Sequence, residues 1–322
     1  MTKMLATRDG FGQGLAELGG MNRNVVALCA DVDESTRANV FRDKFPDRFF
    51  EVGVAEQNMV GMAAGMALAG KIPFAVSYAS FVPCRTYDQI RISVAYNNAN
   101  VKLVGGHAGL TTGFDGATHQ TLEDIAMMRA LPNMTVIVPA DAREARLATM
   151  ALGEHRGPAY LRLGRAPVAS AGDESTPFKI GQAQILRRGS ARMGDAQEGN
   201  DATIVACGIM VNEALEAADQ LAAKHIGVTV INCHTIKPLD TKTLLSSISQ
   251  SKIVVTAEEA QVNGGLGDAI ASLLAENMPH PMAKIAVRDR FGQSGKPQEL
   301  LEEYGLTARH IAEAVIMLLD KY

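Results

Sequence analysis

The chain alternates short apolar runs with longer segments in which apolar residues recur every three or four positions. The short runs are rich in Val, Ile, Leu and Ala, and they predict buried strands at 24–30, 72–78, 101–105, 134–138, 159–163, 202–207, 227–231, 252–256 and 283–287. The longer segments predict helices at 9–19, 55–69, 85–97, 121–130, 141–155, 211–224, 264–276 and 307–319. Strands that alternate with helices are typical of parallel sheets covered on both faces. We therefore expect an α/β protein.

This alternation is interrupted once, by a polar segment rich in Pro, Gly and Ser at 164–178. Such a segment is typical of a linker, and 322 residues fit two domains at roughly 150 residues each. We expect two doubly wound domains, 1–168 and 180–322, joined by a linker at 169–179. A second polar segment, 187–201, predicts an exposed hairpin tip.

Composition and charge narrow the class of protein. Hydrophobic residues make up 47% of the chain and charged residues 20%, as in ordinary globular proteins. The net charge is −4 without a basic cluster, so we expect no nucleic-acid partner. We find neither a signal peptide nor an apolar stretch long enough to span a bilayer, and we expect a soluble cytoplasmic protein with no membrane contact. The four cysteines form no CxxC pair, which predicts buried free thiols at Cys29, Cys84, Cys207 and Cys233.

Several common active-site motifs are missing from the sequence. The glycines of GFGQGLAELGG (10–20) follow no strand and lack dinucleotide-binding spacing. We find no GxxxxGK[ST], HExxH or GxSxG motif and no metal-ligand spacing, so we expect no metal site within this chain. Ligands of open parallel sheets bind at the carboxyl ends of strands. The loops that follow the predicted strands, which hold most of the reactive side chains, are 31–36, 80–85, 106–120, 139–141 and 164–165.

One carboxylate stands at the start of a helix that has no other charge. No charged residue separates Glu56 from Lys71, and Gly, Ala and Met make the intervening helix small and apolar on every face. Such a helix suits close packing inside a protein or a subunit interface. Glu56 is therefore either an exposed first-turn residue, favoured there by the helix dipole, or a desolvated group that needs a partner.

The segment around Glu56, EVGVAEQNMVGMAAGMALAG (51–70), resembles the part of transketolases and their thiamine-diphosphate relatives that carries the cofactor-activating glutamate. The resemblance continues through most of the chain, and it is weaker in the second half. The matching segments are ALCADVDEST (27–36), ASFVPCRTYDQIR (79–91), NNANVKLVGGHAGLTTGFDGATHQTLEDIAMMRALPNMTVIVPADA (97–142), GPAYLRLGRAP (157–167), KPLD (237–240) and EEAQVNGGLGDAI (258–270). It implies a thiamine-diphosphate pyrimidine-binding domain followed by a transketolase C-terminal-like domain.

This resemblance also implies roles for the residues near the cofactor. Glu56 would be catalytic, because a carboxyl group bonded to the aminopyrimidine ring favours the tautomer that activates the cofactor. Tyr78 and Phe81 would stack on the pyrimidine ring. Cys84 stands where the family usually has glycine.

At the substrate end, the resemblance implies a set of polar residues that bind a phosphorylated sugar. Asp115 and His119, within DGATHQ, would read a ketose hydroxyl and the phosphate end, with His119 also serving in catalysis. His107 would contact the donor sugar. The residues that correspond to the family's anion-binding set are Arg8, Ser35 and Arg165. A guanidinium suits phosphate because it donates two parallel hydrogen bonds.

The family binds the cofactor diphosphate and Mg²⁺ with a GDG…NN motif in a preceding domain. This chain has no GDG, and Asn97–Asn98 lies in a different segment. The resemblance therefore implies a split transketolase. Its separate N-terminal subunit would supply most of the contacts to Mg²⁺ and to the cofactor diphosphate. We expect the active site to form when the two subunits pair, with self-association to α2β2.

Three alternatives remain open beside ketol transfer between sugar phosphates. Deoxyxylulose-phosphate synthases are normally single chains with an acidic residue near the place of His107. The β subunits of 2-oxo acid dehydrogenases generally lack the DGxTHQ pattern. A non-catalytic assembly subunit would have no need of Glu56, Asp115 and His119. For the second domain we expect a role in dimerisation and stability, with no charged groups converging on its glycine-rich segment 262–270.

Overall fold

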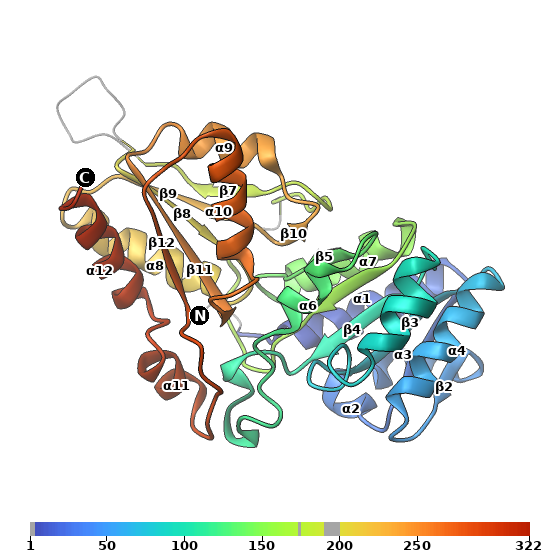
Figure 1. Cartoon of the computed structure of the whole chain (residues 1–322). Helices are drawn as coiled ribbons and strands as arrows, with labels where there is room; N and C mark the ends of the chain where they lie inside the picture. The colour runs from blue at the N-terminus through green and yellow to red at the C-terminus, as the bar shows by residue number, and fades with distance from the viewer. Residues whose placement is uncertain (1–3, 173–174, 190–199) are drawn as a thin grey trace.

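The computed structural model describes residues 4–172, 175–189 and 200–322, which form two sheets covered by helices (Figure 1). The expected α/β class with two mostly parallel domains is confirmed. Within the described residues, no helix is both long and apolar enough to cross a membrane.

The first sheet has seven strands in the order β10-β5-β6-β4-β3-β1-β2. All its pairings are parallel except that of β10 with β5. The strands are β1 (Val25–Cys29), β2 (Phe49–Glu51), β3 (Ile72–Tyr78), β4 (Lys102–Gly106), β5 (Thr135–Ile137), β6 (Ala159–Arg162) and β10 (Thr235–Lys237). The helices of this part are α1 (Thr7–Met21), α2 (Asp33–Thr36), α3 (Asn39–Lys44), η1 (Pro46–Arg48), α4 (Glu56–Leu68), α5 (Tyr87–Gln89), the π-helix η2 (Ile90–Tyr96), the 3₁₀ segment η3 (Leu110–Asp115), α6 (Asp124–Ala130) and α7 (Ala142–Glu154).

Helices cover both faces of this sheet, and that explains its uninterrupted apolar strands. Successive side chains of a strand point to opposite faces. In β1, Val25 and Ala27 join a core with α1 and α7, while Val26 and Leu28 join a second core with α4, η2 and α6. A strand buried on both faces has no reason to alternate with polar residues.

The second sheet has five strands in the order β12-β11-β8-β9-β7, all parallel except the pairing of β7 with β9. Its strands are β7 (Gln184–Arg187), β8 (Ala202–Ala206), β9 (Val228–Asn232), β11 (Ile253–Gln261) and β12 (Met282–Val287). α8 and α12 contribute to the core on one face, and α9 and α10 contribute to the core on the other. The helices are α8 (Met210–Ala222), α9 (Thr241–Ile248), α10 (Leu266–Asn277), α11 (Pro297–Glu303) and α12 (Ala308–Leu319).

The two sheets share one hydrophobic core. Val136 and Tyr160 of the first sheet belong to the same buried cluster as Val205 and Ile231 of the second. β10, which follows β9 in sequence, also adds an edge strand to the first sheet. The boundaries 1–168, 169–179 and 180–322 stay a prediction, but the two parts are packed together.

Every strand and helix predicted from the sequence is present, with bounds shifted by a few residues. The prediction missed the short elements β2, β7, β10, α2, α3, η1, η3, α9 and α11. The greater part of the predicted hairpin tip, 190–199, lies outside the described residues. All four cysteines are described and free; three are buried as expected, and Cys84 is half-buried.

The expectation that no charged group converges on 262–270 is wrong. The buried Glu258 carboxylate accepts hydrogen bonds from the backbone N–H groups of Leu266 (2.7 Å) and Gly267 (2.8 Å) at the start of α10. From the first domain, Arg129 donates to the carbonyl oxygens of Gly264 and Gly265. The first turn of a helix has unpaired N–H groups that favour an anion, which is the physical reason for the carboxylate.

Candidate active site

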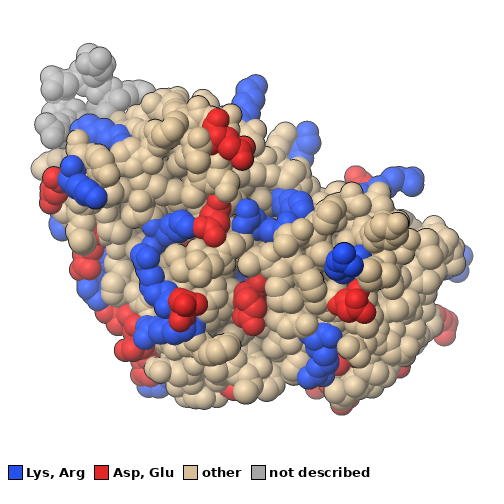
Figure 2. Space-filling model, viewed as in Figure 1, with Lys and Arg blue, Asp and Glu red and all other residues tan. Residues whose placement is uncertain are grey.

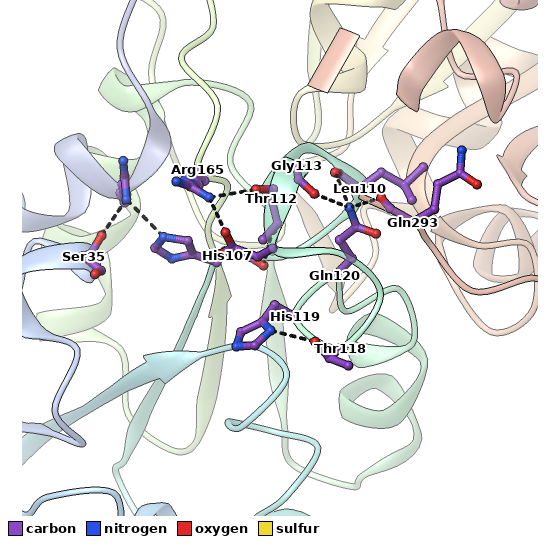
Figure 3. A network of polar contacts seen from close by, with 12 residues as sticks. Ser35, His107, Leu110, Thr112, Gly113, Thr118, His119, Gln120, Arg165 and Gln293 are labelled. Atoms are coloured by element: carbon purple, nitrogen blue, oxygen red, sulfur yellow. Dashed lines mark hydrogen bonds and ion pairs between the residues drawn. The ribbon is translucent and has the colours of Figure 1, made fainter. Parts of the chain in front are cut away.

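The predicted site residues gather at the carboxyl edge of the first sheet, where the strands β3, β4 and β6 end. Tyr78 ends β3, His107 directly follows β4, and Arg165 lies three residues beyond β6. Figure 3 shows Ser35, His107, His119 and Arg165 close to the loop that follows β4. The prediction that the loops after the strands meet is confirmed for this set.

Arg8, near the start of α1, joins two of these residues. Its Nη1 donates to the carbonyl oxygen of Ser35 at 2.8 Å and lies 3.1 Å from Nε2 of His107. Ser35 therefore contributes its carbonyl oxygen to this contact. Because arginine can only donate, the His107 Nε2 must be the acceptor, and the ring proton resides on Nδ1.

His107 is held as a neutral ring with one free donor. Burial, together with the positive charges of Arg8 and Arg165, lowers the pKa of His107 to about 3. Its buried Nδ1 has no hydrogen-bond partner among the described residues. The backbone of His107 has φ of 56°, an uncommon value for this residue type, and the Thr112 hydroxyl donates to its carbonyl oxygen at 2.5 Å. The site thus contains a buried N–H group for which no described residue provides an acceptor.

Arg165 is bound to the same loop through its guanidinium. Nη1 donates to the Thr112 carbonyl oxygen at 3.0 Å (Figure 3). It also donates to Oδ1 of Asp115 at 2.9 Å. Its side chain is 39% exposed, so other guanidinium nitrogens remain accessible to an anion.

Four rings form a cluster beside these polar groups. Tyr78 stacks on His107 with ring centroids 4.0 Å apart, and it lies nearly parallel to Phe81, at 12° and 5.9 Å. His119 presents its edge to Tyr78 and to Phe81, at 6.1 Å and 5.6 Å, while its Nδ1 lies 2.9 Å from the Thr118 hydroxyl. These rings therefore form one connected cluster beside the polar loop.

Glu56 is buried at the start of α4, with 2% of its surface exposed. Arg85 donates from Nη1 to its Oε2 at 2.9 Å, and the same guanidinium lies 4.4 Å from the Phe81 ring centroid. The exposed first-turn interpretation of Glu56 is therefore wrong, because the carboxylate is desolvated and has a partner.

The helix α4 buries only one side within this chain. Met59, Val60, Ala63 and Ala64 are buried, whereas the opposite side, Gln57, Asn58, Gly61, Gly65 and Leu68, is exposed. No atom lies within 4 Å of a Cβ built on Gly61 or Gly65, and Leu68 is 73% exposed. The chain alone thus leaves a flat, weakly polar helix face open next to the buried Glu56.

Two members of the site were missed by the sequence analysis. Arg85 was left without a role, because residues 79–86 form irregular turns in which spacing along the chain does not predict a ring contact. Thr112 gave no such signal, because it acts through its carbonyl and hydroxyl groups within an irregular loop. In the part of the chain that the structure describes, no group of three or more His, Cys, Asp or Glu residues is placed to hold a metal ion.

Comparison with known proteins identifies the family. The transketolase pyrimidine-binding domain matches residues 3–169, and the transketolase C-terminal domain matches residues 192–311. The chain is 44% identical to the 6-deoxy-6-sulfo-D-fructose transketolase subunit SqwH of Clostridium sp. (strain MSTE9), over 95% of this chain and 92% of that protein.

Two further relatives match along nearly their whole length. A putative transketolase C-terminal section of Methanocaldococcus jannaschii is 42% identical over 98% of this chain and 96% of its own length. A solved structure of a split-gene transketolase, an inactive β4 tetramer, superposes with a TM-score of 0.89 at 45% identity, covering 98% of this chain and 99% of that one. The chain belongs to the transketolase family, and it carries the pyrimidine-binding and C-terminal domains of that family.

Proposed function

We propose that the chain is the C-terminal subunit of a split transketolase, which transfers a two-carbon ketol unit from a ketose phosphate to an aldose phosphate with thiamine diphosphate. The observation that carries this proposal is the buried Glu56 carboxylate, which Arg85 links to the Phe81 ring, at the edge of an open helix face. Relatives of the same length, described as a transketolase subunit and as a C-terminal section, support it.

The residues present fit the aminopyrimidine part of thiamine diphosphate. The Arg85 guanidinium is a planar, nitrogen-rich cation that contacts the face of Phe81 and donates an N–H to Glu56. A protonated aminopyrimidine has the same flat shape and the same N–H donors, so it could replace the guanidinium at both contacts. Glu56, Phe81 and Tyr78 would hold the ring. When bound, the cofactor supplies the carbon nucleophile and electron sink of ketol transfer.

We propose the other roles from the resemblance, and the contacts support them. Glu56 would exchange a proton with the pyrimidine nitrogen as a general acid–base carboxyl. His107, which stacks on Tyr78 and lies beside Arg8, would contact the donor sugar. His119, at the edge of the aromatic cluster, moves a proton at the sugar hydroxyls and helps to bind the phosphate.

The anionic end of the sugar is bound by a second group. Arg165 presents its exposed nitrogens, and Asp115 both holds that guanidinium and reads a hydroxyl. Arg8 adds a second cation, with Ser35 beside it. Since SqwH is named for a sulfonated sugar, the anion to be tested includes sulfonate as well as phosphate.

The partner is a separate N-terminal transketolase subunit that binds the diphosphate and Mg²⁺. The segment that leads into α4, together with α4 and η2, would be covered on assembly to α2β2, because it exposes large apolar side chains. Those side chains and their exposures are Val54 (72%), Leu68 (73%), Ile92 (45%) and Tyr96 (83%). Water-exposed apolar area of this kind favours association. We place the complex in the cytoplasm.

Reconstitution tests this function. We expect the isolated chain to bind thiamine diphosphate and magnesium weakly in a calorimetric titration, because the diphosphate carries most of the charge that a site must bind. Ketol transfer should appear only when the N-terminal subunit is added, with sugar phosphates and their sulfonate analogues assayed in parallel. Micromolar cofactor binding or ketol transfer by the chain alone would exclude a split subunit.

The same reconstituted complex separates the alternatives. Condensation of pyruvate with an aldose phosphate would indicate a deoxyxylulose-phosphate synthase activity. Oxidation of a 2-oxo acid in the presence of an acyl acceptor would indicate a dehydrogenase β subunit. If no acyl or ketol transfer occurs with a partner that binds the cofactor, the chain is an assembly subunit.

A further inference from the structure

Two adjacent carboxylates near the end of β11 are buried and have no part in the chemistry described above. Glu258 is 0% exposed and Glu259 is 4% exposed. Each accepts a backbone N–H at the start of a helical segment. Glu258 caps α10 in its own domain, whereas Glu259 accepts from the Thr111 N–H of the first domain at 2.6 Å. Burying a carboxylate costs free energy, so its presence beside the loop that follows β4 needs a physical reason.

The loop is shaped to admit this carboxylate. Gly109 has φ of +86°, and a Cβ at that position would lie 2.3 Å from the Glu259 carboxyl carbon. A side chain at position 109 would therefore be strained by its backbone conformation and would collide with the carboxylate. Gly109 and Glu259 together form a fitted contact between the two domains.

The segment that Glu259 caps, η3, contacts the residues proposed to bind the substrate. Thr111 is the second residue of η3, and the next residue, Thr112, accepts from Arg165 through its carbonyl and donates to the His107 carbonyl through its hydroxyl. Asp115, the last residue of η3, also bonds Arg165. A shift of this short segment would move the anion-binding and hydroxyl-binding groups together.

The second domain holds the other side of the loop as well. Gln120 donates from Nε2 to the carbonyl oxygens of Leu110, Gly113 and Gln293, and Gln293 belongs to the second domain (Figure 3). α11 packs against η3, and the two lie side by side in Figure 1. The buried Arg162 donates to the Glu259 carbonyl oxygen at 2.9 Å, which fixes the strand from which the carboxylate extends.

We propose that Glu259 is a positioning residue for substrate binding: from the second domain it caps η3 and thereby sets Arg165, His107 and Asp115 in place. The second domain then takes part in substrate recognition, beyond the dimerisation and stability expected of it. Burial raises the pKa of Glu259 to about 7, and Arg162 and the Thr111 N–H partly offset this effect. The kinetic part of this inference rests on the proposed function.

Hydrogen–deuterium exchange of the purified full chain tests the structural part without any activity. In Glu259→Ala we expect amide exchange of residues 109–116 to speed up by about tenfold, the effect of losing one hydrogen bond to a buried carboxyl group. Glu259→Gln keeps an acceptor oxygen and should fall between that variant and the wild type. Protection of the β1 and β3 amides shows that each variant remains folded, and Glu259→Gln decides the matter if Glu259→Ala does not fold.

The neighbouring carboxylate is a matched control. Glu258→Gln and Glu258→Ala remove an equally buried group from the same strand, and they should speed exchange at 264–268 while leaving 109–116 as in the wild type. Equal loosening of 109–116 in both series would show a general core effect and overturn the proposal. Unchanged exchange at 109–116 in both Glu259 variants would overturn it as well.

Kinetics of the reconstituted complex test the consequence for substrate binding. Glu259→Ala should raise KM for a phosphorylated donor by about tenfold with a smaller change in kcat, and Glu259→Gln should recover most of the loss. A fall in kcat at unchanged KM would contradict a positioning role. If the wild-type complex shows no ketol transfer, the proposed function fails while the exchange experiment still decides the role of Glu259.

Discussion

Arg85 and Glu56 form an ion pair in which only one partner is exposed. The guanidinium is 46% exposed and the carboxylate 2% exposed, with 2.9 Å between Nη1 and Oε2. The arginine also covers one ring of the aromatic cluster at Phe81. In the chain alone, Arg85 therefore pairs with Glu56, the group proposed to activate the cofactor. It also covers the face of Phe81, the ring proposed to stack on the cofactor.

Removing that cation should destabilise the isolated chain. Arg85→Met keeps the aliphatic part of the side chain and leaves the Glu56 carboxylate buried without a partner, which we expect to cost about 1–3 kcal/mol of unfolding free energy. In a Glu56→Gln background the same substitution should cost less, because no charge remains to be paired. Urea unfolding of the two single variants and the double variant measures the coupling. Equal losses in both backgrounds would show that the pair contributes nothing to stability.

The carboxylate itself is tested in the assembled enzyme. Glu56→Gln keeps the shape of the side chain but removes its titratable proton, so we expect turnover to fall by a factor of about a hundred or more. Assembly with the N-terminal subunit, measured by the elution volume in size-exclusion chromatography, should be the same as in the wild type. Near-normal turnover would assign Glu56 a structural role at the start of α4.

Arg165 should affect substrate binding more than chemistry. A charge-assisted hydrogen bond contributes roughly 1.5–3 kcal/mol, so Arg165→Ala should raise KM for phosphorylated sugars about ten- to a hundredfold with little change in kcat. The effect should nearly vanish with hydroxypyruvate, which has no phosphate to bind. Equal losses with both donors would show that Arg165 supports the loop or the cofactor.

The buried histidine predicts a pH dependence of stability. The pKa of His107 is lowered to about 3 in the folded chain, compared with about 6.5 in an unfolded chain. The unfolded state therefore binds the extra proton first, and the contribution of His107 is full above pH 6.5 and is lost as pH falls toward 3. Between pH 7.5 and 5, His107→Gln should lose less unfolding free energy than the wild type, as measured by urea midpoints. An equal loss in both proteins would contradict the lowered pKa.

Charge is distributed without a dominant sign on the face seen in Figure 2. Lys, Arg, Asp and Glu side chains lie near the boundary between the two parts of the molecule, and most of the remaining surface is uncharged. Two cations of the candidate site form ion pairs, Arg165 with Asp115 and Arg85 with Glu56. The proposed recognition of an anionic sugar would therefore depend on local geometry at the loop after β4.

The sequence by itself determined the α/β class, the strands and helices with strong periodicity, and the residues that meet at the edge of the first sheet. It could do so because apolar periodicity and the segment around Glu56 are local features, and parallel strands place their following loops at one edge. Short elements such as β10, the edge strand that pairs with β5, had no comparable local pattern.

Only the tertiary structure decided which groups satisfy the buried charges. Glu56 was recognisable in sequence, but its pairing with Arg85 depends on how the turn after β3 is placed against α4. Glu259 and Thr111 are 148 positions apart, and no periodicity links a carboxylate on one strand with a backbone N–H in a loop of the other domain. Such contacts form when two domains pack on a shared core. A buried polar group needs a hydrogen-bond partner, and the tertiary structure determines which group is near enough to be that partner.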